Sequence, residues 1–386
     1  MKRTRTGTYI KTTTLGEEVK AFVPDPLPPV PELEFGLPMQ ELLGEANRGL
    51  GALDTMAMIL PDTSLFLYMY VRKEAVLSSQ IEGTQSSLSD LLMYENEQRP
   101  GVPLDDVQEV SQYVAALEHG LHRMRTDGFP LSLRLLKEMH EKLLSSGRGS
   151  TKMPGEFRTS QNWLGGGRPS RATFVPPPPG EAMLECLRAL EGFLHDQPVR
   201  TPPLIKAALA HVQFETIHPF LDGNGRLGRL LITLTLCHEQ AMREPLLYLS
   251  LYFKRHRTRY YRLLQNVRET GDWEVWLTFF LQGVIETSRV AVNVIRSGLA
   301  LFAQHRGELS IWNNSGSALA IHEFMQRRPI LSIKQAAQAA NVSEPTASTV
   351  LRKMEEAAIV REITGGQRNR LYAYNSFISL LDEGIE

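Results

Sequence analysis

Apolar residues recur at three- and four-residue spacing through most of the chain, which is the pattern of helices with one buried face. From about Pro38, the segment MQELLGEANRGLGALDTMA shows this spacing, and a second helix is predicted over residues 62–83, where Gly83 is a typical helix stop. Further helices are predicted at residues 86–95, 105–126, 131–146, 180–195, 203–215, 226–241, 254–270 and 272–303. The chain is therefore expected to be mainly helical.

Two segments interrupt the helical pattern. Within residues 1–37, the stretch FVPDPLPPVPELEF holds five prolines in fourteen residues. Proline at this density excludes helix and the interior of a sheet, so we expect an extended arm that lies across a folded surface. Residues 155–179 set β-compatible residues around three successive glycines and close on four prolines, which predicts a short hairpin or flap.

The last part of the chain, residues 318–386, predicts three helices with a turn before the third, followed by two strands. Ser332 and Ser343 stand where they can cap the second and third helices. A helix-turn-helix followed by a hairpin resembles a winged helix. Between Arg327 and Arg370 there are eight basic and four acidic residues, so contact with DNA is open. Two glutamates on the third helix favour a protein-interaction or dimerisation module instead.

These patterns divide the chain into five segments. In order, they are a proline-rich extended arm (1–37), N-terminal helices (38–104), a helical core (105–303), a linker (304–317) and a small α+β unit that resembles a winged helix (318–386).

Length and composition fit a globular protein with several such parts. The chain has 386 residues, 42% of them hydrophobic, and a formal net charge of −1, so no global charge draws it to nucleic acid or anionic lipid. The two cysteines, Cys186 and Cys237, lie in apolar surroundings, which argues for a reducing compartment. Without the apolar stretch of a secretory signal or a run of about 18 apolar residues, we expect a cytoplasmic protein that does not contact membranes.

One polar stretch, HPFLDGNGRLGR, lies at residues 218–229 between two apolar helices. Pro219 discourages helix at His218, which leaves the imidazole at the C-terminal edge of the first helix. The second helix follows the glycine loop, and Arg226 and Arg229 share one face of its first turn. Basic residues at a helix N-terminus oppose the helix dipole, unless an anion binds between them and the exposed amides.

The loop DGNG completes this arrangement. Its glycines permit a turn that aims successive N–H groups into one concavity, and together with the two arginines they predict a polyphosphate site. A phosphate would repel Asp222 unless a divalent cation such as Mg²⁺ lies between them. His218 is near enough to accept a proton from an attacking hydroxyl, so the residues predict phosphoryl or nucleotidyl transfer. The alternative, a helix cap followed by a plain tight turn, gives Asp222 and the arginines no role.

The same twelve residues resemble the active-site motif of Fic-domain proteins, His-x-Phe-x-Asp/Glu-Gly-Asn-Gly-Arg-x-x-Arg. The resemblance implies a Fic-type helical core, over roughly residues 60–300, that transfers AMP from ATP to a Ser, Thr or Tyr hydroxyl of a target protein. It implies that His218 is the general base, that Phe220 packs beneath the loop and that Asp222 binds Mg²⁺ or Mn²⁺. It also implies an anion hole and phosphate clamp made of Gly223, Asn224, Gly225, Arg226 and Arg229.

Two further segments resemble parts of Fic proteins. FRTSQNWLGG with FVPPPP is similar to the flap that aligns the target segment by strand addition, here through Leu164, Gly165 and Gly166. RYYRLLQNV is similar to the segment whose paired tyrosines, here Tyr260 and Tyr261, approach the adenine. Core packing is the alternative for these tyrosines.

The segment SSQIEG, residues 78–83, predicts a regulatory contact. Ser78 and Glu82 are four residues apart and therefore share one helix face. A glutamate at a helix C-terminus is disfavoured by the dipole, so a distant cationic partner is expected for Glu82. The segment, with Gly83, resembles the Fic inhibitory motif Ser/Thr-x-x-x-Glu-Gly/Asn, which implies that Glu82 pairs with Arg229 and restrains the enzyme. An exposed glutamate near a helix cap is the alternative.

The sequence thus predicts an autoinhibited protein adenylyltransferase whose partners are ATP and a hydroxyl-bearing target protein, and it leaves a homodimer open. A rival hypothesis is a regulatory protein that binds nucleotide or DNA and has an idle core. Two others keep the enzyme but let it remove AMP or use another phosphate-linked donor. The intact His218, Asp222 and Arg229 favour the adenylyltransferase.

Overall fold

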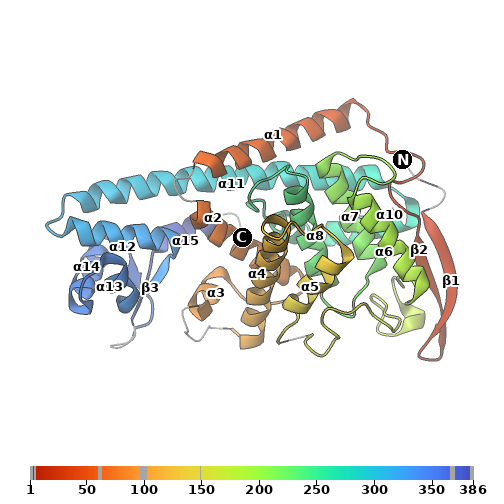
Figure 1. Ribbon diagram of the computed structural model, residues 1–386, viewed down its shortest axis with the longest axis horizontal. Helices are drawn as coiled ribbons and strands as arrows, with labels where there is room; N and C mark the ends of the chain where they lie inside the picture. The colour runs from red at the N-terminus through yellow and green to blue at the C-terminus, as the bar shows by residue number, and fades with distance from the viewer. Residues whose placement is uncertain are drawn as a thin grey trace.

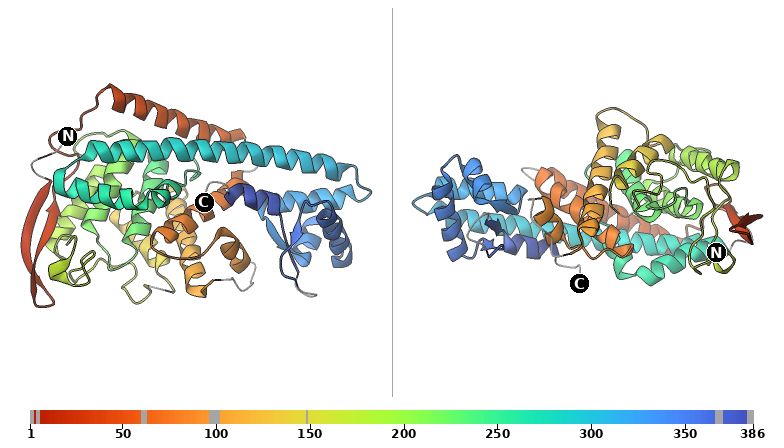
Figure 2. Two further views of the ribbon diagram at one scale, coloured as in Figure 1. Left: turned by 180° about the vertical axis from the view of Figure 1, so that it is seen from behind. Right: turned by 90° about the horizontal axis from the view of Figure 1, so that it is seen from below.

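Helix α11 (Trp273–Ser310) runs along the long axis of the molecule, and α1 (Leu37–Ile59) packs beside it (Figure 1). The helices between α2 and α10 gather below one half of α11, while the C-terminal segments lie below its other end (Figure 2). The predicted mainly helical fold is confirmed. The computed structural model describes residues 3, 6–59, 63–95, 102–147, 149–365 and 370–382.

Most predicted helices are present within a few residues of their predicted bounds. One of them, predicted over 254–270, is divided at His256 into two helices. Residue 62, the predicted start of the second helix, lies outside the described residues. Between α1 and α11 the helices are α2 (Thr63–Ile81), α3 (Leu88–Glu95), α4 (Leu104–Arg125), α5 (Leu133–Leu143), α6 (Glu181–Leu194), α7 (Pro203–Ile217), α8 (Asn224–His238), α9 (Ser250–Arg255) and α10 (Arg257–Thr270).

The N-terminal arm differs from its prediction. Strands β1 (Gly7–Thr14) and β2 (Glu17–Pro24) form an antiparallel hairpin with a turn at Leu15 and Gly16, where the arm was expected to be extended and unpaired. Alternating β-branched and aromatic residues in GTYIKTTT favour this strand, whereas the prolines that guided the prediction begin only at the end of β2. The hairpin stands beside the flap (Figure 1), and the Phe22 N–H donates a hydrogen bond to the Val175 carbonyl at 2.8 Å.

The predicted linker, residues 304–317, is largely helical. Helix α11 continues to Ser310, because Phe302, His305 and Leu309 recur at helical spacing and are buried against their neighbours. Polar residues between these positions hid this continuation in the sequence. Only four residues separate α11 from α12 (Ser315–Arg327).

The C-terminal unit begins with the three predicted helices, but it also contains a short strand and a final helix that the sequence analysis missed. Strands β3 (Ile330–Ser332), β4 (Arg361–Glu362) and β5 (Leu371–Ala373) form an antiparallel sheet in the order β3-β5-β4. The predicted caps at Ser332 and Ser343 are confirmed, since each side chain accepts a hydrogen bond from the backbone three residues later. The helices are α13 (Ile333–Ala340), α14 (Glu344–Glu356) and α15 (Asn375–Asp382).

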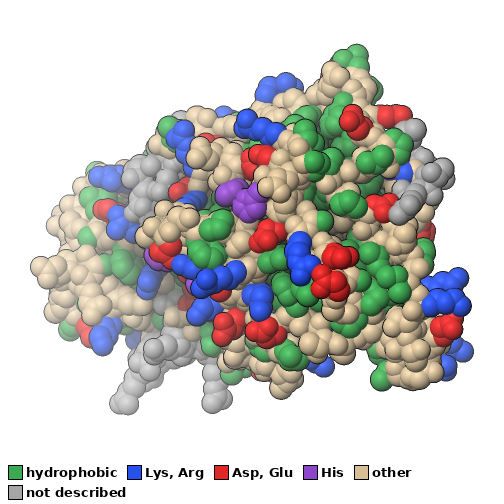
Figure 3. Space-filling model, turned by 45° about the vertical axis from the view of Figure 1, so that its right-hand side comes forward, with side chains coloured by type: hydrophobic (Ala, Val, Ile, Leu, Met, Phe, Trp, Pro, Cys, Tyr) green, Lys and Arg blue, Asp and Glu red, His purple; other side chains and the backbone are tan. Residues whose placement is uncertain are grey.

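The surface carries charges of both signs. On the face shown in Figure 3, basic, acidic and hydrophobic side chains are interspersed, as the net charge of −1 leads one to expect. No helix in the described part of the chain is both long and apolar enough to cross a membrane.

Helix α2 joins the C-terminal unit to the helical core. Near its start, the ring of Phe66 packs against Phe302 of α11 and edge-on against Phe377 of α15, with ring centroids 6.2 and 6.0 Å apart. Further along, the buried Lys73 donates a hydrogen bond from Nζ to the Leu381 carbonyl at 2.5 Å. One helix is therefore held at its N-terminal half by segments more than 200 residues away in the sequence.

Replacing Phe66 by alanine tests this junction. The ring is fully buried, so Phe66→Ala is expected to lower the free energy of unfolding by about 3–5 kcal/mol, through lost burial and the cavity that remains. Urea unfolding monitored by circular dichroism measures the change. Tyr9→Ala, at a ring that is 62% exposed, is the control and should change stability little. A loss below about 1 kcal/mol for Phe66→Ala would show that these rings do not hold α2 in place.

Candidate active site

A pocket of about 210 Å³ brings together most of the residues predicted to act on the phosphates. It lies at the junction of α7 and α8, below the end of α2. Its lining residues are Glu82, Glu109, Leu164, His218, Asp222, Gly223, Asn224, Gly225 and Arg226. Segments that are far apart in the sequence thus meet at the predicted motif.

The backbone of the loop follows from its residues. Helix α7 ends at Ile217, and His218 takes a left-handed conformation (φ 49°) that turns the chain away before Pro219. At the other end Gly223 has φ 76°, a conformation that favours glycine, and α8 begins at the next residue. The Asn224 side chain closes the loop, because it accepts a hydrogen bond from the Phe220 N–H and donates one to the Phe220 carbonyl, at 2.9 and 2.8 Å. The Asn224 side chain is therefore engaged in shaping the loop, while its backbone N–H lies at the start of α8.

His140 of α5 supports the loop from below and was missed in the sequence analysis. Its ring stacks on Phe220 with centroids 3.7 Å apart. Nδ1 accepts a hydrogen bond from the Gly155 N–H, which fixes the tautomer, and Nε2 donates to the Asp222 carbonyl at 3.0 Å. Burial lowers the pKa of His140 to about 4, so the ring is neutral at neutral pH. In the sequence it is one histidine on an amphipathic helix, 82 residues before its partner.

Arg158 fastens the flap to the loop and was also missed as a functional residue. The buried guanidinium donates to the His218 carbonyl at 2.9 Å and to the Pro177 carbonyl at 2.5 Å. Burial lowers the pKa of Arg158 to about 10, which still leaves it charged. Arg158, near the start of the flap, thus connects the backbone of His218 to Pro177 near its end.

The flap itself is less regular than the predicted hairpin. Residues 155–179 are mostly irregular, with one isolated antiparallel bridge between Leu164 and Phe174 and one 3-10 turn at Pro169–Arg171. Leu164 lines the pocket, and the three glycines after it have positive φ. At Gly166 a Cβ atom would collide with the Arg171 carbonyl, so this turn requires glycine. Proline-rich sequence after Phe174 explains why no ladder continues.

The N-terminus of α8 concentrates positive charge, as predicted. The backbone N–H groups of Asn224, Gly225 and Arg226 have no partner within the helix, since they belong to its first turn. The buried guanidinium of Arg226 lies 2.6 Å from Glu109 of α4, a carboxylate that the sequence analysis missed. Asp222 remains partly exposed to the pocket, with Oδ1 accepting from the Gly223 N–H at 2.6 Å.

Arg229 is held by the two residues predicted to restrain it. Its Nη2 lies 2.7 Å from Glu82 Oε1, and its Nε donates to Ser78 Oγ at 2.7 Å. The Glu82 carboxylate also abuts the first turn of α8, since a Cβ atom at Gly225 would collide with it. Burial alone would raise the pKa of Glu82, but Arg229, followed by Arg226 and His218, holds it below its usual value. Ser78 and Glu82 thus both contact Arg229 from the C-terminal end of α2, which is followed by Gly83 with φ 104°.

Burial controls the protonation of His218. It lowers the pKa of the imidazole to about 3, with Arg268 and Arg158 acting in the same direction, so the ring is neutral at neutral pH. Nδ1 has no hydrogen-bond partner among the described residues. A neutral imidazole can accept a proton, which is the first requirement of a general base.

The two tyrosines predicted to approach an adenine differ from each other. Tyr260 is buried, and its hydroxyl bonds His211 Nε2 at 2.8 Å in the core. Tyr260 therefore packs behind the site, which is the alternative that the sequence left open. Tyr261 is 41% exposed, so it is the solvent-accessible tyrosine of this pair, and its contact with adenine stays a prediction.

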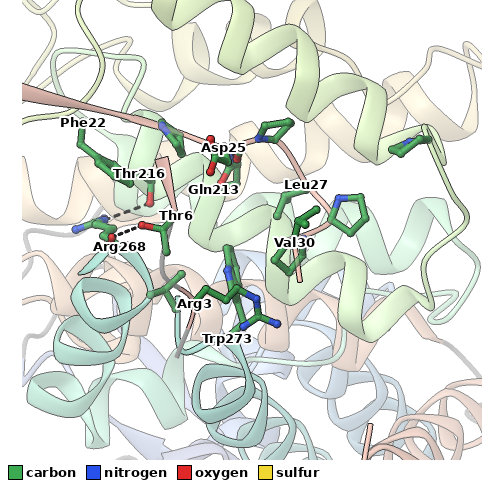
Figure 4. Close-up of a pocket in the computed structure, with 16 residues that line it drawn as sticks. Arg3, Thr6, Phe22, Asp25, Leu27, Val30, Gln213, Thr216, Arg268 and Trp273 are labelled. Atoms are coloured by element: carbon green, nitrogen blue, oxygen red, sulfur yellow. Dashed lines mark hydrogen bonds between the residues drawn. The ribbon is translucent and has the colours of Figure 1, made fainter. Parts of the chain in front are cut away.

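A second pocket, of about 380 Å³, lies between the proline-rich segment, α7, α10 and α11 (Figure 4). Apolar side chains such as Leu27 and Val30 make up much of its wall, and Arg268 donates to Thr216 at its edge. None of the residues predicted to act on the phosphates lines it. This larger pocket is therefore not the candidate for catalysis.

Comparison with known proteins agrees with the site. Residues 40–122 match the Fic/DOC family N-terminal region, and residues 130–236, which include the loop and His140, match the Fic/DOC family. The chain is therefore similar to Fic/DOC family proteins over these two consecutive regions.

Its relatives include curated proteins and a solved structure. The chain is 32% identical over 180 residues to the protein adenylyltransferase Fic of Culex quinquefasciatus and 30% identical over 179 residues to that of Drosophila grimshawi. These matches cover 46% of this chain but only 33% and 34% of the relatives, so the chain spans about a third of their length. A Fic family protein from Desulfovibrio desulfuricans G20 has a similar fold, with a TM-score of 0.56 and 20% identity over 89% of this chain and 97% of that one.

Replacing His140 by phenylalanine tests the support of the loop. The variant keeps an aromatic ring against Phe220 but leaves the Gly155 N–H and the Asp222 carbonyl without partners. We expect His140→Phe to lower the free energy of unfolding by about 1–3 kcal/mol, measured by urea unfolding. His195→Phe, at a histidine outside the loop, should have little effect. Equal stability of His140→Phe and the parent protein would contradict the role assigned to the two hydrogen bonds.

Proposed function

We propose that this protein transfers AMP from ATP to a hydroxyl group of a target protein and releases diphosphate. The observation that carries the proposal is the meeting of a neutral His218 with the N-terminus of α8 in one pocket. The relatives named protein adenylyltransferase Fic support the same reaction.

The residues of the loop have separate roles in this proposal. The free N–H groups at the start of α8 bind the phosphates, with the helix dipole adding to their attraction. Arg229 Nη1, buried and without a hydrogen-bond partner among the described residues, is a donor available to the outer phosphates. His218 accepts the proton of the target hydroxyl as its oxygen attacks the α-phosphorus. The Leu164 N–H and carbonyl are engaged with Phe174 and Thr173 inside the flap, so an extended target segment would align along the outer side of the flap that this bridge shapes.

A divalent cation fits the site only together with the nucleotide. Among the described residues, no group of three or more His, Cys, Asp or Glu side chains is arranged to hold a metal ion. Asp222 keeps a partly exposed carboxylate at the pocket, and Mg²⁺ is commonly held by one carboxylate plus phosphate oxygens. When bound, the cation would neutralise phosphate charge, and Asp222 would hold it.

The same arrangement gives a mechanism of restraint. With Glu82 bound to Arg229, a carboxylate occupies the start of α8 where the phosphates would bind. A triphosphate must then compete with an anion that the chain itself supplies. Removal of Glu82 frees Arg229 and the N-terminus of α8 together.

Loss of the base should abolish transfer. We expect His218→Ala to lower the rate of AMP transfer by about 10²–10⁴-fold, because the neutral imidazole is the proposed acceptor of the hydroxyl proton. Incorporation of radiolabelled AMP from ATP into the protein itself gives the rate, and calorimetric titration with ATP should show that nucleotide binding is retained. Transfer at the parent rate would remove His218 from the role of base.

Loss of the restraint should have the opposite effect. We expect Glu82→Gly to raise auto-adenylylation at least about tenfold, which corresponds to about 1.4 kcal/mol. Glu82→Gln is the matched comparison, since it keeps the shape but weakens the attraction to Arg229, and should give a smaller rise. Unchanged or lower labelling of Glu82→Gly would contradict autoinhibition.

Mass spectrometry of the labelled protein identifies the group that is transferred. A mass increment of AMP supports ATP as the donor, and another increment would indicate a different phosphate-linked donor.

A further inference from the structure

A second buried carboxylate lies beside His218 and has no role in the mechanism so far. Glu215 is on the last turn of α7, three residues before the histidine, and its side chain is buried. Its Oε2 lies 3.9 Å from His218 Nδ1, which is too long for a hydrogen bond. Its Oε1 and that Nδ1 both lack a hydrogen-bond partner among the described residues. Buried polar atoms in this state are rare, and a functional role is one of the usual reasons.

The packing around Glu215 leaves room for its carboxylate. On α8, a Cβ atom at Gly228 would stand 2.7 Å from Glu215 Oε1, so only glycine leaves this space open. On α10, Arg268 donates to the Glu215 backbone carbonyl at 3.1 Å and to Thr216 Oγ1 at 3.2 Å, which fixes the last turn of α7. The carboxylate is thus buried, and its Oε1 accepts no hydrogen bond from the described residues.

We propose that Glu215 is a positioning residue that accepts a hydrogen bond from His218 Nδ1 when the imidazole becomes protonated. The inference rests on the proposed AMP transfer and assigns a partner to its base. A shift of about 1 Å closes the gap between Glu215 Oε2 and His218 Nδ1 and gives the unpartnered Nδ1 an acceptor. The role resembles that of any carboxylate that orients a catalytic imidazole through its second nitrogen.

The proton and bond changes balance with this partner in place. The target hydroxyl gives its proton to His218 Nε2, its oxygen bonds to the α-phosphorus, and the bond from that phosphorus to the diphosphate oxygen breaks. Diphosphate leaves with the electron pair. The imidazolium then carries N–H groups on both nitrogens, and the Glu215 carboxylate accepts from Nδ1. Arg268 and Arg158 disfavour this charge. The Glu215 backbone and Glu82 favour it, and the Glu215 carboxylate adds a further favourable partner.

The charges facing Glu215 set the direction of its pH effect. Burial raises its pKa to about 7, Arg229 on α8 and Arg268 on α10 act against this, and Glu82 beyond α2 adds to it. His218 itself is neutral at these pH values. Below this pKa the carboxyl group is protonated and cannot stabilise the imidazolium. The transfer rate should therefore rise with pH as Glu215 ionises. Removal of Glu82 should move this rise to lower pH, because Glu82 raises the pKa of Glu215.

The experiment uses the full chain in the Glu82→Gly background. We expect Glu215→Gln to lower kcat for AMP transfer about 10- to 100-fold, to leave the KM for ATP within about twofold and to flatten the rise of kcat with pH between 5.5 and 8. Glu215→Asp retains a carboxylate and should keep that rise with a smaller loss of kcat. Glu138→Gln, a carboxylate paired with Arg123 away from the site, is the matched control and should behave as the parent.

Each outcome separates this inference from the proposed function. No AMP transfer by the Glu82→Gly parent would refute the function itself. Transfer by Glu215→Gln at the parent kcat, with the same pH profile, would overturn the role of Glu215 alone. If Glu215→Gln has a lowered melting temperature and no longer binds ATP, its low activity reflects misfolding, and Glu215→Asp becomes the test of the positioning role. In that variant, a retained pH rise supports the positioning role and a flat profile overturns it.

Discussion

Three backbone N–H groups and two buried arginines concentrate positive charge at the first turn of α8, and the surrounding structure is arranged to balance it. Charges buried without a counterion are costly, so each arginine has a carboxylate: Glu109 for Arg226 and Glu82 for Arg229. The two carboxylates differ in exposure. Glu109 is almost completely enclosed, whereas the Glu82 side chain is 34% exposed and comes from the end of a different helix. Glu82 is therefore the counterion that an incoming anion can replace.

The rest of the core holds this helix end and His218 at fixed positions. His140 and Arg158 bind backbone carbonyls of the loop, and Asn224 closes it with two hydrogen bonds to a single residue. These contacts use neutral or fully engaged groups, so they give the loop its shape without competing for phosphate. Helix α2 presents Glu82 at one end and packs against α15 at the other. The helix that leads to the Glu82–Arg229 contact is thus also packed against the C-terminal unit.

The sequence predicted the helices and the pocket well for a physical reason. Helical periodicity is local, and the motif at 218–229 places its polar groups within twelve consecutive residues at the junction of α7 and α8. His140, Glu109 and Arg158 escaped prediction because their roles arise only when distant helices pack together. The hairpin at β1 and β2 was missed because prolines dominated the interpretation of the arm, and the continuation of α11 was missed because polar residues surround its buried positions. Tyr260 shows the converse, since a motif that suggested a ligand contact is mostly core packing.

The central claim is that the triphosphate of a nucleotide binds at the N-terminus of α8, in the place of Glu82. The most direct measurement is a crystal structure of Glu82→Gly with ATP and Mg²⁺. The account predicts phosphate oxygens on the N–H groups of residues 224–226 and on Arg229, with the α-phosphorus facing His218. Density for the nucleotide in the pocket of Figure 4, with the first turn of α8 free of phosphate, would contradict it.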